Sequence, residues 1–514
     1  MKKHFLGSAA ILALMTTAAI ADNNEADVEQ LGNLNTASVS QQNGSSNGAW
    51  LLQDGNRNDF DIEQSADTPS GNSWGGNEVG TDTNAASQLG NRNTATISQG
   101  TSGNEVGTRG QGFVQTGNGN SADIDQQSGG NRVNQLVQDS ENADGGANVV
   151  EVEQGAPRPG QNVPYNNVIS SISQERTGAG GANRISVDQG SKFARIGQSG
   201  GAGTTGGGLE QLGNGNVMGV TQDREDAIRS VIQDNSASAA GGNRASITQD
   251  GTNGAGNDLQ QITQSGGGNR LTIIQDGASN SEGTNFTSGG MAQAVRAASA
   301  AQVSEGDVLQ FGDGNVLRYT ITGDENLFGS KQQGSGNIAR ASSIVGDRNE
   351  LAIWQQGNDS VAVVTHDGSD NDIGIAQYNG DINNAAVRIR ADGDGSSDNN
   401  HAGVVQNGGG NTFDLSIRGD DNNDDMFTAV DTMSLATMAG LTVGQFNQNG
   451  NGNDFGADIR GDGNLIGALQ DGNDNVADGS ITGSFNEVAI AQVGNTNMTS
   501  FNQLGSSNSI AVSQ

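Results

Sequence analysis

The 514-residue chain has no cysteine, only four prolines and few aromatic residues, which make up 4 % of its composition. The absence of cysteine excludes a disulfide framework and any thiolate metal site. Hydrophobic residues reach only 32 %, which is too little for a conventional globular core in a chain of this length. Scarce proline is compatible with long stacks of strands, because proline cannot donate a hydrogen bond to a neighbouring strand.

Histidine is scarce as well, with three residues in the whole chain. Without cysteine and with so little histidine, the usual nucleophile and base pairs of enzymes are almost unavailable. No cluster of acidic and basic residues typical of polysaccharide-cleaving solenoids is present either. We therefore expect no catalytic residues, no cofactor and no enzymatic activity.

Long hydrophobic runs are confined to the N-terminus. Two lysines precede an apolar stretch from Phe5 to Ile20, and Ala19-Ile20-Ala21 is typical of a cleavage site. Residues 1–21 are therefore predicted to be a secretory signal peptide. No second segment of membrane-spanning length follows, so we expect an exported chain without a membrane-spanning segment.

The chain is strongly acidic, with a formal net charge of −34. Such a surface repels nucleic acid and anionic membranes and favours cations or basic partners. Outward carboxylates in stacked strands would face one another at short range, so we interpret them as a brake on premature stacking. Assembly is then expected to accelerate near the isoelectric point of about 4.1 or at high salt.

What the sequence does contain is a strict eleven-residue repeat, Gln-x-Gly-x-x-Asn-x-ø-x-ø-x, where ø is usually apolar. It runs without a miss through residues 448–514. Its first position is held by Gln448, Ile459, Gln470, Ile481, Gln492, Gln503 and Gln514. Its bend glycines are Gly450, Gly461, Gly472, Gly483, Gly494 and Gly505, and its asparagines are Asn453, Asn464, Asn475, Asn486, Asn497 and Asn508.

The spacing within each repeat predicts one strand and one bend. From the asparagine to the next glutamine, every second residue belongs to one set, and alternation at period two indicates a strand with one buried face. The four residues between glutamine and asparagine are rich in Gly, Asp and Asn, which close tight turns. We expect the Asn, ø, ø and Gln side chains to point inward.

Repetition at a fixed period predicts how these strands bury their inner faces. Two repeats form a coil of about 22 residues, and successive coils pair in register about 4.8 Å apart. Like residues then lie over like, and each buried amide donates to one neighbouring coil and accepts from the other. The predicted fold is an all-β parallel β-solenoid with two strands per coil and loop insertions.

One stretch carries a family resemblance. Gln88-Leu-Gly90-Asn-Arg-Asn93-Thr-Ala95-Thr-Ile97-Ser-Gln99 resembles the curlin repeat, the amyloid-forming unit of curli fibre subunits. The resemblance implies that Gln88, Asn93 and Gln99 belong to amide ladders and that Gly90 is a bend glycine. It further implies an extracellular fibre of identical subunits for cell adhesion and biofilm matrix, an outer-membrane export channel and a nucleator subunit as partners.

A second interpretation stays open, namely a secreted monomeric β-solenoid that acts as an adhesin or surface-binding protein. The length of the chain favours it, because curlin subunits are much shorter and less interrupted. The C-terminus favours the fibre, because residues 448–514 end on the repeat residue Gln514. Electron microscopy and fibre diffraction would distinguish the two.

The repeats divide the chain into segments with interruptions between them. Met291 to Val303 is alanine-rich and predicted to be a short helix. Met426 to Val443 is interpreted as a small cap or a patch for a partner, and a cap on an irregular part of the stack is favoured. The expected segments are N-terminal repeats at 22–64, a loop insertion at 65–87, repeats with variable bends at 88–275, an insertion at 276–309, repeats at 310–417, an acidic and then apolar insertion at 418–447, and the regular repeats at 448–514.

Several residues outside the repeat pattern are candidates for other roles. His366 occupies a glutamine position and is interpreted as a structural substitute for glutamine, whereas His401 is expected to point outward. Trp50 and Trp354 are also expected to point outward, either as lateral contacts or as isolated surface aromatics.

Two motifs suggest ligands. Gly419 to Asp425 and Gly393-Asp394 offer oxygen ligands for calcium, but the spacing of calcium-binding β-rolls is missing, so solvated acidic bends are favoured. Arg418-Gly419-Asp420 and Arg460-Gly461-Asp462 look like adhesion tripeptides. Both lie where the repeat demands Gly and commonly takes Asp, so composition alone accounts for them.

Overall fold

The computed structural model describes most of the chain, and the fold is all-β, with 55 % strand and 4 % helix. The described residues are 11–12, 23–42, 46–65, 76–140, 147–155, 166–177, 180–190, 193–197, 207–251, 256–281, 286, 290–298, 303–390 and 397–514. The predicted signal peptide therefore lies outside the described residues, apart from residues 11 and 12. Two compact units share the chain: unit 1 is 1–256 with 264–268, and unit 2 is 257–263 with 269–514.

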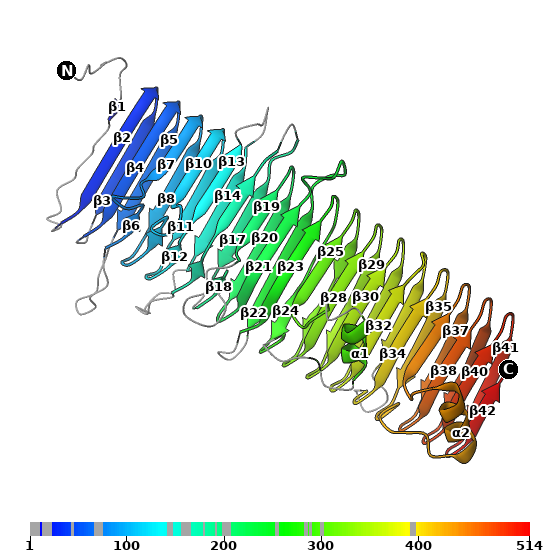
Figure 1. Cartoon of the computed structure of the whole chain (residues 1–514). Helices are drawn as coiled ribbons and strands as arrows, with labels where there is room; N and C mark the ends of the chain where they lie inside the picture. Colours follow the sequence, from blue (N-terminus) through cyan, green and yellow to red (C-terminus); the bar gives the residue numbers. More distant parts are fainter. Residues whose placement is uncertain are drawn as a thin grey trace. The chain divides into compact units, whose positions relative to one another are not determined.

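In each unit the strands form two parallel sheets, here called sheet A and sheet B (Figure 1). Sheet A of unit 1 contains β1 (Ile11–Leu12), β3 (Thr36–Gln42), β5 (Asp59–Ser65), β8 (Thr94–Gln99), β11 (Ser121–Gln126), β14 (Val149–Gln154), β17 (Arg184–Gln189), β20 (Val217–Asp223) and β22 (Arg244–Gly251). Its sheet B contains β2 (Glu25–Asn33), β4 (Gly48–Asn56), β6 (Glu78–Val79), β7 (Ala86–Asn91), β9 (Glu105–Val106), β10 (Phe113–Asn118), β12 (Arg132–Val133), β13 (Leu136–Ser140), β15 (Val168–Ile169), β16 (Ile172–Glu175), β18 (Arg195–Ile196), β19 (Leu209–Leu212) and β21 (Ala227–Asp234). The division between the units falls within β23 (Asp258–Ser265).

Unit 2 repeats the same arrangement. Its sheet A contains β24 (Gln275–Gly277), β26 (Val316–Arg318), β27 (Ile321–Thr322), β29 (Ile338–Val345), β31 (Val361–Asp367), β33 (Asn384–Ile389), β35 (Thr412–Arg418), β37 (Asp454–Arg460), β39 (Val476–Thr482) and β41 (Met498–Leu504). Its sheet B contains β25 (Asp307–Phe311), β28 (Leu327–Gln333), β30 (Glu350–Gln356), β32 (Asp372–Tyr378), β34 (His401–Asn407), β36 (Gln445–Asn449), β38 (Leu465–Asp471), β40 (Glu487–Val493) and β42 (Ser509–Ser513).

The C-terminal coils of unit 2 show the construction most clearly. The chain alternates between the sheets, so that β37 and β39 pair in sheet A while β38 and β40 pair in sheet B. Each pairing is parallel and in register, with Ile459 opposite Ile481 and Gln470 opposite Gln492. Two strands and two bends therefore make one coil of a parallel β-solenoid, which confirms the predicted fold class.

Side chains of both sheets fill the space between them. Within a strand buried and outward residues alternate, as the pleat requires. Phe413, Phe446 and Phe455 pack together between the sheets with ring centroids 5.0–5.4 Å apart. Such aromatic clusters are few, so the narrow core is filled mainly by Ile, Val, Leu and Ala together with buried Asn and Gln.

The bend glycines bring successive coils into close approach. Gly472 has φ of 131°, and a Cβ on it would lie 1.8 Å from the carbonyl oxygen of Gly494 in the next coil. Gly90 is equally constrained, because its Cβ would lie 2.1 Å from the Gly117 carbonyl oxygen. Only glycine fits these positions, since other residues clash and disfavour this backbone conformation.

In unit 1 some coils contain a third, short strand. Glu78–Val79 forms β6, which pairs with β4 and β9, inside the stretch expected to be a loop at 65–87. Asn77 and Asn104 precede β6 and β9, and the Asn104 N–H donates to Asn77 Oδ1 at 3.1 Å. Part of this stretch thus belongs to the stack, while residues 66–75 lie outside the described residues.

Two helices lie on the outer face of sheet B in unit 2, as Figure 1 shows. Helix α1 (Met291–Ala298) covers β30 and β32, in agreement with the expected helix after Met291. It packs on Ala352 and Ala376. Its first two N–H groups donate to the nearly buried Asp372 carboxylate at 2.5 and 2.8 Å.

Helix α2 (Val430–Ala439) covers β40 and β42. Its approach segment is bound by Glu487, whose carboxylate accepts the N–H groups of Thr428 and Ala429 at 3.0 and 2.9 Å and the hydroxyl of Thr432. Burial alone raises the pKa of Glu487, but these hydrogen bonds outweigh it and hold the pKa below its usual range. An insertion predicted to cap the stack thus lies on its outer face.

Candidate functional site

The most regular feature of unit 2 is a column of glutamines in sheet B, in which Gln448, Gln470 and Gln492 are buried and Gln514 is exposed. The Nε2 of Gln448 donates to Gln470 Oε1 at 2.9 Å, Gln470 donates to Gln492 at 3.0 Å, and Gln492 donates to Gln514 at 3.1 Å. Each Nε2 also donates across the core to a sheet A carbonyl, as Gln470 does to Asp454 at 2.8 Å. One amide therefore links two coils and both sheets.

Unit 1 carries such a column in each sheet. In sheet B Gln88 accepts from Gln53 at 2.8 Å and donates to Gln115 at 2.9 Å. In sheet A Gln99 accepts from Gln64 and donates to Gln126, both at 2.9 Å. All of these side chains are buried, so each amide replaces its lost hydration with hydrogen bonds to identical neighbours.

Sheet A of unit 2 is different, because isoleucine holds the equivalent position on most of its strands. Ile389, Ile417, Ile459 and Ile481 follow one another in register. Gln503 continues this column after Ile481; its Nε2 donates to the Glu487 carbonyl at 3.2 Å, and its Oε1 is buried without a partner among the described residues.

His366 also belongs to this isoleucine column, between Ile344 and Ile389. The interpretation of His366 as a substitute for glutamine is therefore wrong, since no amide lies above or below it. Both ring nitrogens are buried and have no hydrogen-bond partner among the described residues. Burial lowers the pKa of His366 to about 3, so the ring is neutral at physiological pH.

The asparagines form a second kind of ladder, at the start of each strand. The backbone N–H of Asn475 donates to Asn453 Oδ1 at 3.1 Å, and its Nδ2 donates to the Gly494 carbonyl in the following coil at 2.8 Å. Asn93 makes the same bonds in unit 1, to Asn58 and Gly117. Asn464, Asn486, Asn497 and Asn508 likewise donate their backbone N–H to the preceding coil at 3.0 Å.

Sequence reasoning missed a third ladder, which lies within the bends. The N–H of Asn451 donates to Asn473 Oδ1 at 2.9 Å, and the N–H of Asn473 donates to Asn495 Oδ1 at 2.7 Å. Aspartate does the same where it occupies this position, since Asp462 Oδ1 accepts the Asp420 N–H at 3.1 Å. The recurrence of Asn, Asp or Ser directly after each bend glycine was the available signal.

Two outward aspartates, Asp123 and Asp454, have a raised pKa, to which neighbouring carboxylates contribute. Burial raises the pKa of Asp123, and Asp125 beside it and Glu151 opposite it on β14 raise it further. Burial likewise raises the pKa of Asp454, with a contribution from Asp478 on the next strand of the sheet. Stacking in register therefore accumulates repulsion that acid would relieve.

The acidic segment suggested for calcium is occupied by internal bonds. Asp421 Oδ1 accepts from the Asn399 side chain at 2.9 Å, Asp424 Oδ1 lies 3.1 Å from His401 Nε2, and Asp425 Oδ1 accepts the Met426 N–H at 2.8 Å. In the described part of the chain, no group of three or more His, Asp or Glu side chains is arranged to hold a metal ion. Gly393-Asp394 lies outside the described residues.

The adhesion-like tripeptides belong to the stack rather than to projecting loops. Asp420 Oδ1 accepts the Asp398 N–H at 2.8 Å, and the Arg460 guanidinium donates to Asp458 at 2.7 and 3.0 Å. The tryptophans are half-buried: Trp50 lies over Gly48, and Trp354 stacks on Tyr378 beneath α1 at 5.0 Å.

Comparison with family models places a curlin associated repeat at residues 21–49, a stretch that includes β2, β3 and the start of β4. A search of the curated proteins gave no match. Within the described residues, no helix is both long and apolar enough to cross a membrane. Proteins with this repeat are structural and form extracellular fibres. The matched repeat at residues 21–49, together with the stacked glutamine and asparagine ladders, supports membership of the chain in the curlin-repeat family.

Proposed function

We propose that the chain is a secreted structural subunit that assembles with copies of itself into extracellular, curli-like amyloid fibres for cell adhesion and biofilm matrix, and that it has no enzymatic activity. Family membership supports the structural role and the extracellular fibre. The apolar leader at 1–21 supports secretion. An outer-membrane export channel and a nucleator subunit are the partners that the resemblance suggests.

The observation that carries this proposal is the direction of the ladders. In inner coils the asparagine Nδ2 points to the following coil, as Asn475 does to the Gly494 carbonyl. In the last coils Asn497 Nδ2 is buried and has no partner among the described residues. Gln514 Nε2 donates only to the Met498 carbonyl, at 3.0 Å, so a further glutamine amide can accept from it.

Strand edges supply the remaining bonds for growth. Among the described residues β42 pairs with β40 and β41 pairs with β39, each along one side. An unpaired edge in a flat parallel stack templates another strand. A second copy whose glutamine and asparagine columns match would continue the same pattern, which favours a polar fibre with identical steps.

Electron microscopy and fibre diffraction of the purified mature protein test this function directly. We expect unbranched fibres and a meridional reflection near about 4.7 Å, the spacing of stacked strands. Monomers after long incubation, without that reflection, would instead support the secreted monomeric adhesin.

A glycine substitution tests the growing face specifically. A Cβ on Gly483 would lie 2.1 Å from the Gly505 carbonyl oxygen, whereas Gly505 itself has nothing closer than 3.5 Å. Gly505→Ala, at φ of 102°, should therefore strain its own bend without a clash against another coil of the same chain, yet obstruct the next copy. Gly440→Ala, at another positive φ with open space, is the control for backbone strain. Elongation of Gly505→Ala at the wild-type rate would exclude stacking on this face.

A further inference from the structure

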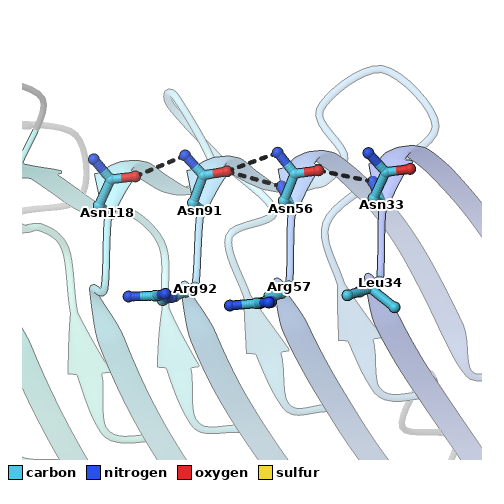
Figure 2. Close-up of a pocket in the computed structure, with 7 residues that line it drawn as sticks. All are labelled: Asn33, Leu34, Asn56, Arg57, Asn91, Arg92 and Asn118. Carbon is cyan, nitrogen blue, oxygen red and sulfur yellow. Dashed lines mark hydrogen bonds between the residues drawn. The ribbon is translucent and has the colours of Figure 1, made fainter.

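Two arginines project side by side from consecutive bends of unit 1. Figure 2 shows Arg57 and Arg92 extending along the stack, one coil apart, below a row of asparagine amides. Both have φ of 59° and are exposed. Together they line an open groove of about 490 Å³. The residues lining this groove are Asn33, Leu34, Asn56, Arg57, Asn91, Arg92 and Asn118.

The asparagine row makes one wall of the groove rigid. Asn56 Nδ2 donates to Asn91 Oδ1 at 3.0 Å, and Asn91 Nδ2 donates to Asn118 Oδ1 at 2.9 Å. The bends that carry the arginines are thereby held at the spacing of stacked strands, about 4.8 Å. The two guanidinium groups are presented at a fixed step.

Neither arginine has an ion-pair partner among the described residues, although the chain is strongly acidic. Asp54 and Asp59 flank Arg57 in the sequence, but no ion pair joins them to it. Two like charges one coil apart repel each other, so the arrangement favours an external anion.

Unit 2 shows what an arginine at this position binds when a carboxylate is available. Arg348 occupies the same place in its bend, with φ of 55°. Its Nε and Nη2 donate to the two carboxylate oxygens of Asp370 in the next coil at 2.7 and 2.6 Å. At the position in the next coil that corresponds to Asp370, Arg57 faces Arg92 and Arg92 faces Gly119, so neither arginine faces a carboxylate there. The guanidinium fork is therefore available for a carboxylate from outside.

We propose that Arg57 and Arg92 bind Asp420 and Asp462 of a second copy of the chain in a lateral contact. Asp420 and Asp462 lie in consecutive coils, because Asp462 Oδ1 accepts the Asp420 N–H. The Oδ2 atoms of both aspartates have no partner among the described residues. Arg460 lies close in sequence, but it donates to Asp458.

Matching steps favour a second copy over a free polyanion. The strand spacing sets the step of both rows, so two rigid arginines meet two rigid carboxylates in register. A flexible acidic polymer lacks this rigidity and loses conformational freedom when it binds, whereas the net charge of −34 repels a polymer and a second copy alike and so does not distinguish them. The contact goes beyond the proposed function, since it joins molecules side by side and needs no fibre growth.

Sedimentation velocity of the full-length soluble protein at low and high salt tests the proposal. We expect salt-sensitive self-association that Arg57→Asn with Arg92→Asn weakens about fivefold to tenfold. Asparagine tolerates the positive φ, so these bends should fold normally. The matched control, Arg184→Gln with Arg244→Gln, removes the same charge from exposed positions on β17 and β22 and should leave the association unchanged.

The partner residues are tested by Asp420→Asn with Asp462→Asn. These changes keep the Oδ1 acceptors, since Asn473 and Asn495 serve the same ladder elsewhere. We expect the same weakening, with no further loss when both pairs of changes are combined. An additive loss, or an effect equal to that of the control, would overturn the proposal.

Cross-linking identifies the contact itself. In the Arg57→Lys, Arg92→Lys variant, carbodiimide should couple the new amines to Asp420 or Asp462, and a mixture of ¹⁴N and ¹⁵N protein reports which links join different copies. Cross-links only within one copy, or association that requires added polyuronate or nucleic acid, would refute the second copy as partner. Fibre elongation measured in parallel should be unchanged, so failure of either idea is recognised separately.

Discussion

His366 offers the sharpest test of how the isoleucine column works. It is fully buried on β31 between Ile344 and Ile389, and neither ring nitrogen has a hydrogen-bond partner among the described residues. Protonation would place an uncompensated charge in the core, and burial accordingly lowers the pKa to about 3. We predict that this residue makes the surrounding coils sensitive to acid.

The size of the effect follows from linkage. The unfolded chain binds the imidazole proton with a pKa near 6.5, whereas the folded chain binds it near 3. Stability is therefore full above pH 6.5 and is lost as the pH falls toward 3. One pKa unit corresponds to about 1.4 kcal/mol, so the loss is about 3 kcal/mol at pH 4.5 and about 5 kcal/mol below pH 3.

The perturbation is His366→Ile, which restores an unbroken isoleucine column. At pH 7 we expect a gain of about 1–3 kcal/mol, because two unsatisfied nitrogens leave the core. The difference from wild type should then grow by about 3 kcal/mol between pH 7 and pH 4.5. Hydrogen exchange of the β31 amides, corrected for the intrinsic pH dependence, measures this locally without assuming two-state unfolding.

A titration of the imidazole resonances by NMR supplies the independent check. The chain has three histidines, and the spectrum of His366→Ile assigns the signal that is lost. A resonance for His366 that titrates near pH 6.5 would refute the burial argument. Equal loss of β31 protection between pH 7 and 4.5 in wild type and variant would refute the linkage.

Three further predictions concern the ladders and their coverings. Gln470→Leu should destabilise its coil by about 2–4 kcal/mol in hydrogen exchange, because both neighbouring amides lose a partner; unchanged protection would contradict this. Glu487→Gln should increase hydrogen exchange of the α2 amides. The wild-type chain should show the same increase as the pH falls below the lowered pKa of Glu487. Equal protection of these amides at all pH values would argue that the Glu487 carboxylate does not hold α2 in place. Assembly should accelerate near pH 4 or at high salt, because repulsion between carboxylates is then reduced. Equal thioflavin-T lag times at pH 4 and pH 7 would show that this repulsion does not limit assembly. His366→Ile should be assayed at both pH values as well, because protonation of His366 destabilises the coils over the same pH range.

Deletion of 448–514 should slow fibre growth, because this block is the most regular part of the stack. Unchanged growth would show that nucleation lies elsewhere. A deletion of equal length from the middle of the chain is the control for size.

The fold was predictable because the residue pattern of the repeat specifies the strand, the bend and the stacking. A period of two within each repeat indicates the strand, and the glycine indicates the bend. The fixed spacing between Gln448 and Gln470 indicates stacking in register. Burial of Asn475 and Gln470 followed from the same pattern, since only a ladder of like residues satisfies a buried amide in every coil.

What escaped prediction depends on contacts between distant parts of the sequence. Asp372 binds the start of α1 across 81 residues of chain, and no local pattern marks such a pair. The isoleucine column was visible in Ile459 and Ile481, which alternate with glutamines. To interpret it, one must know that consecutive repeats belong to opposite sheets. Without that knowledge, His366 was compared with the glutamines of sheet B instead of Ile344 and Ile389 of sheet A.

Side chains, rather than the number of residues per coil, fix the register of the stack. Gln448 and Gln470 are 22 residues apart and bond at 2.9 Å, whereas Gln406 and Gln448 are 42 residues apart and bond at 2.8 Å. The longer coil accommodates α2 because Asn422 and Gln448 return to their columns at either end of the insertion. Insertions on the outside can therefore vary without cost to the ladders, provided that each coil still presents its asparagines and its inward strand residues. The columns set the register, which leaves the helices and outward bends free to determine what the surface contacts.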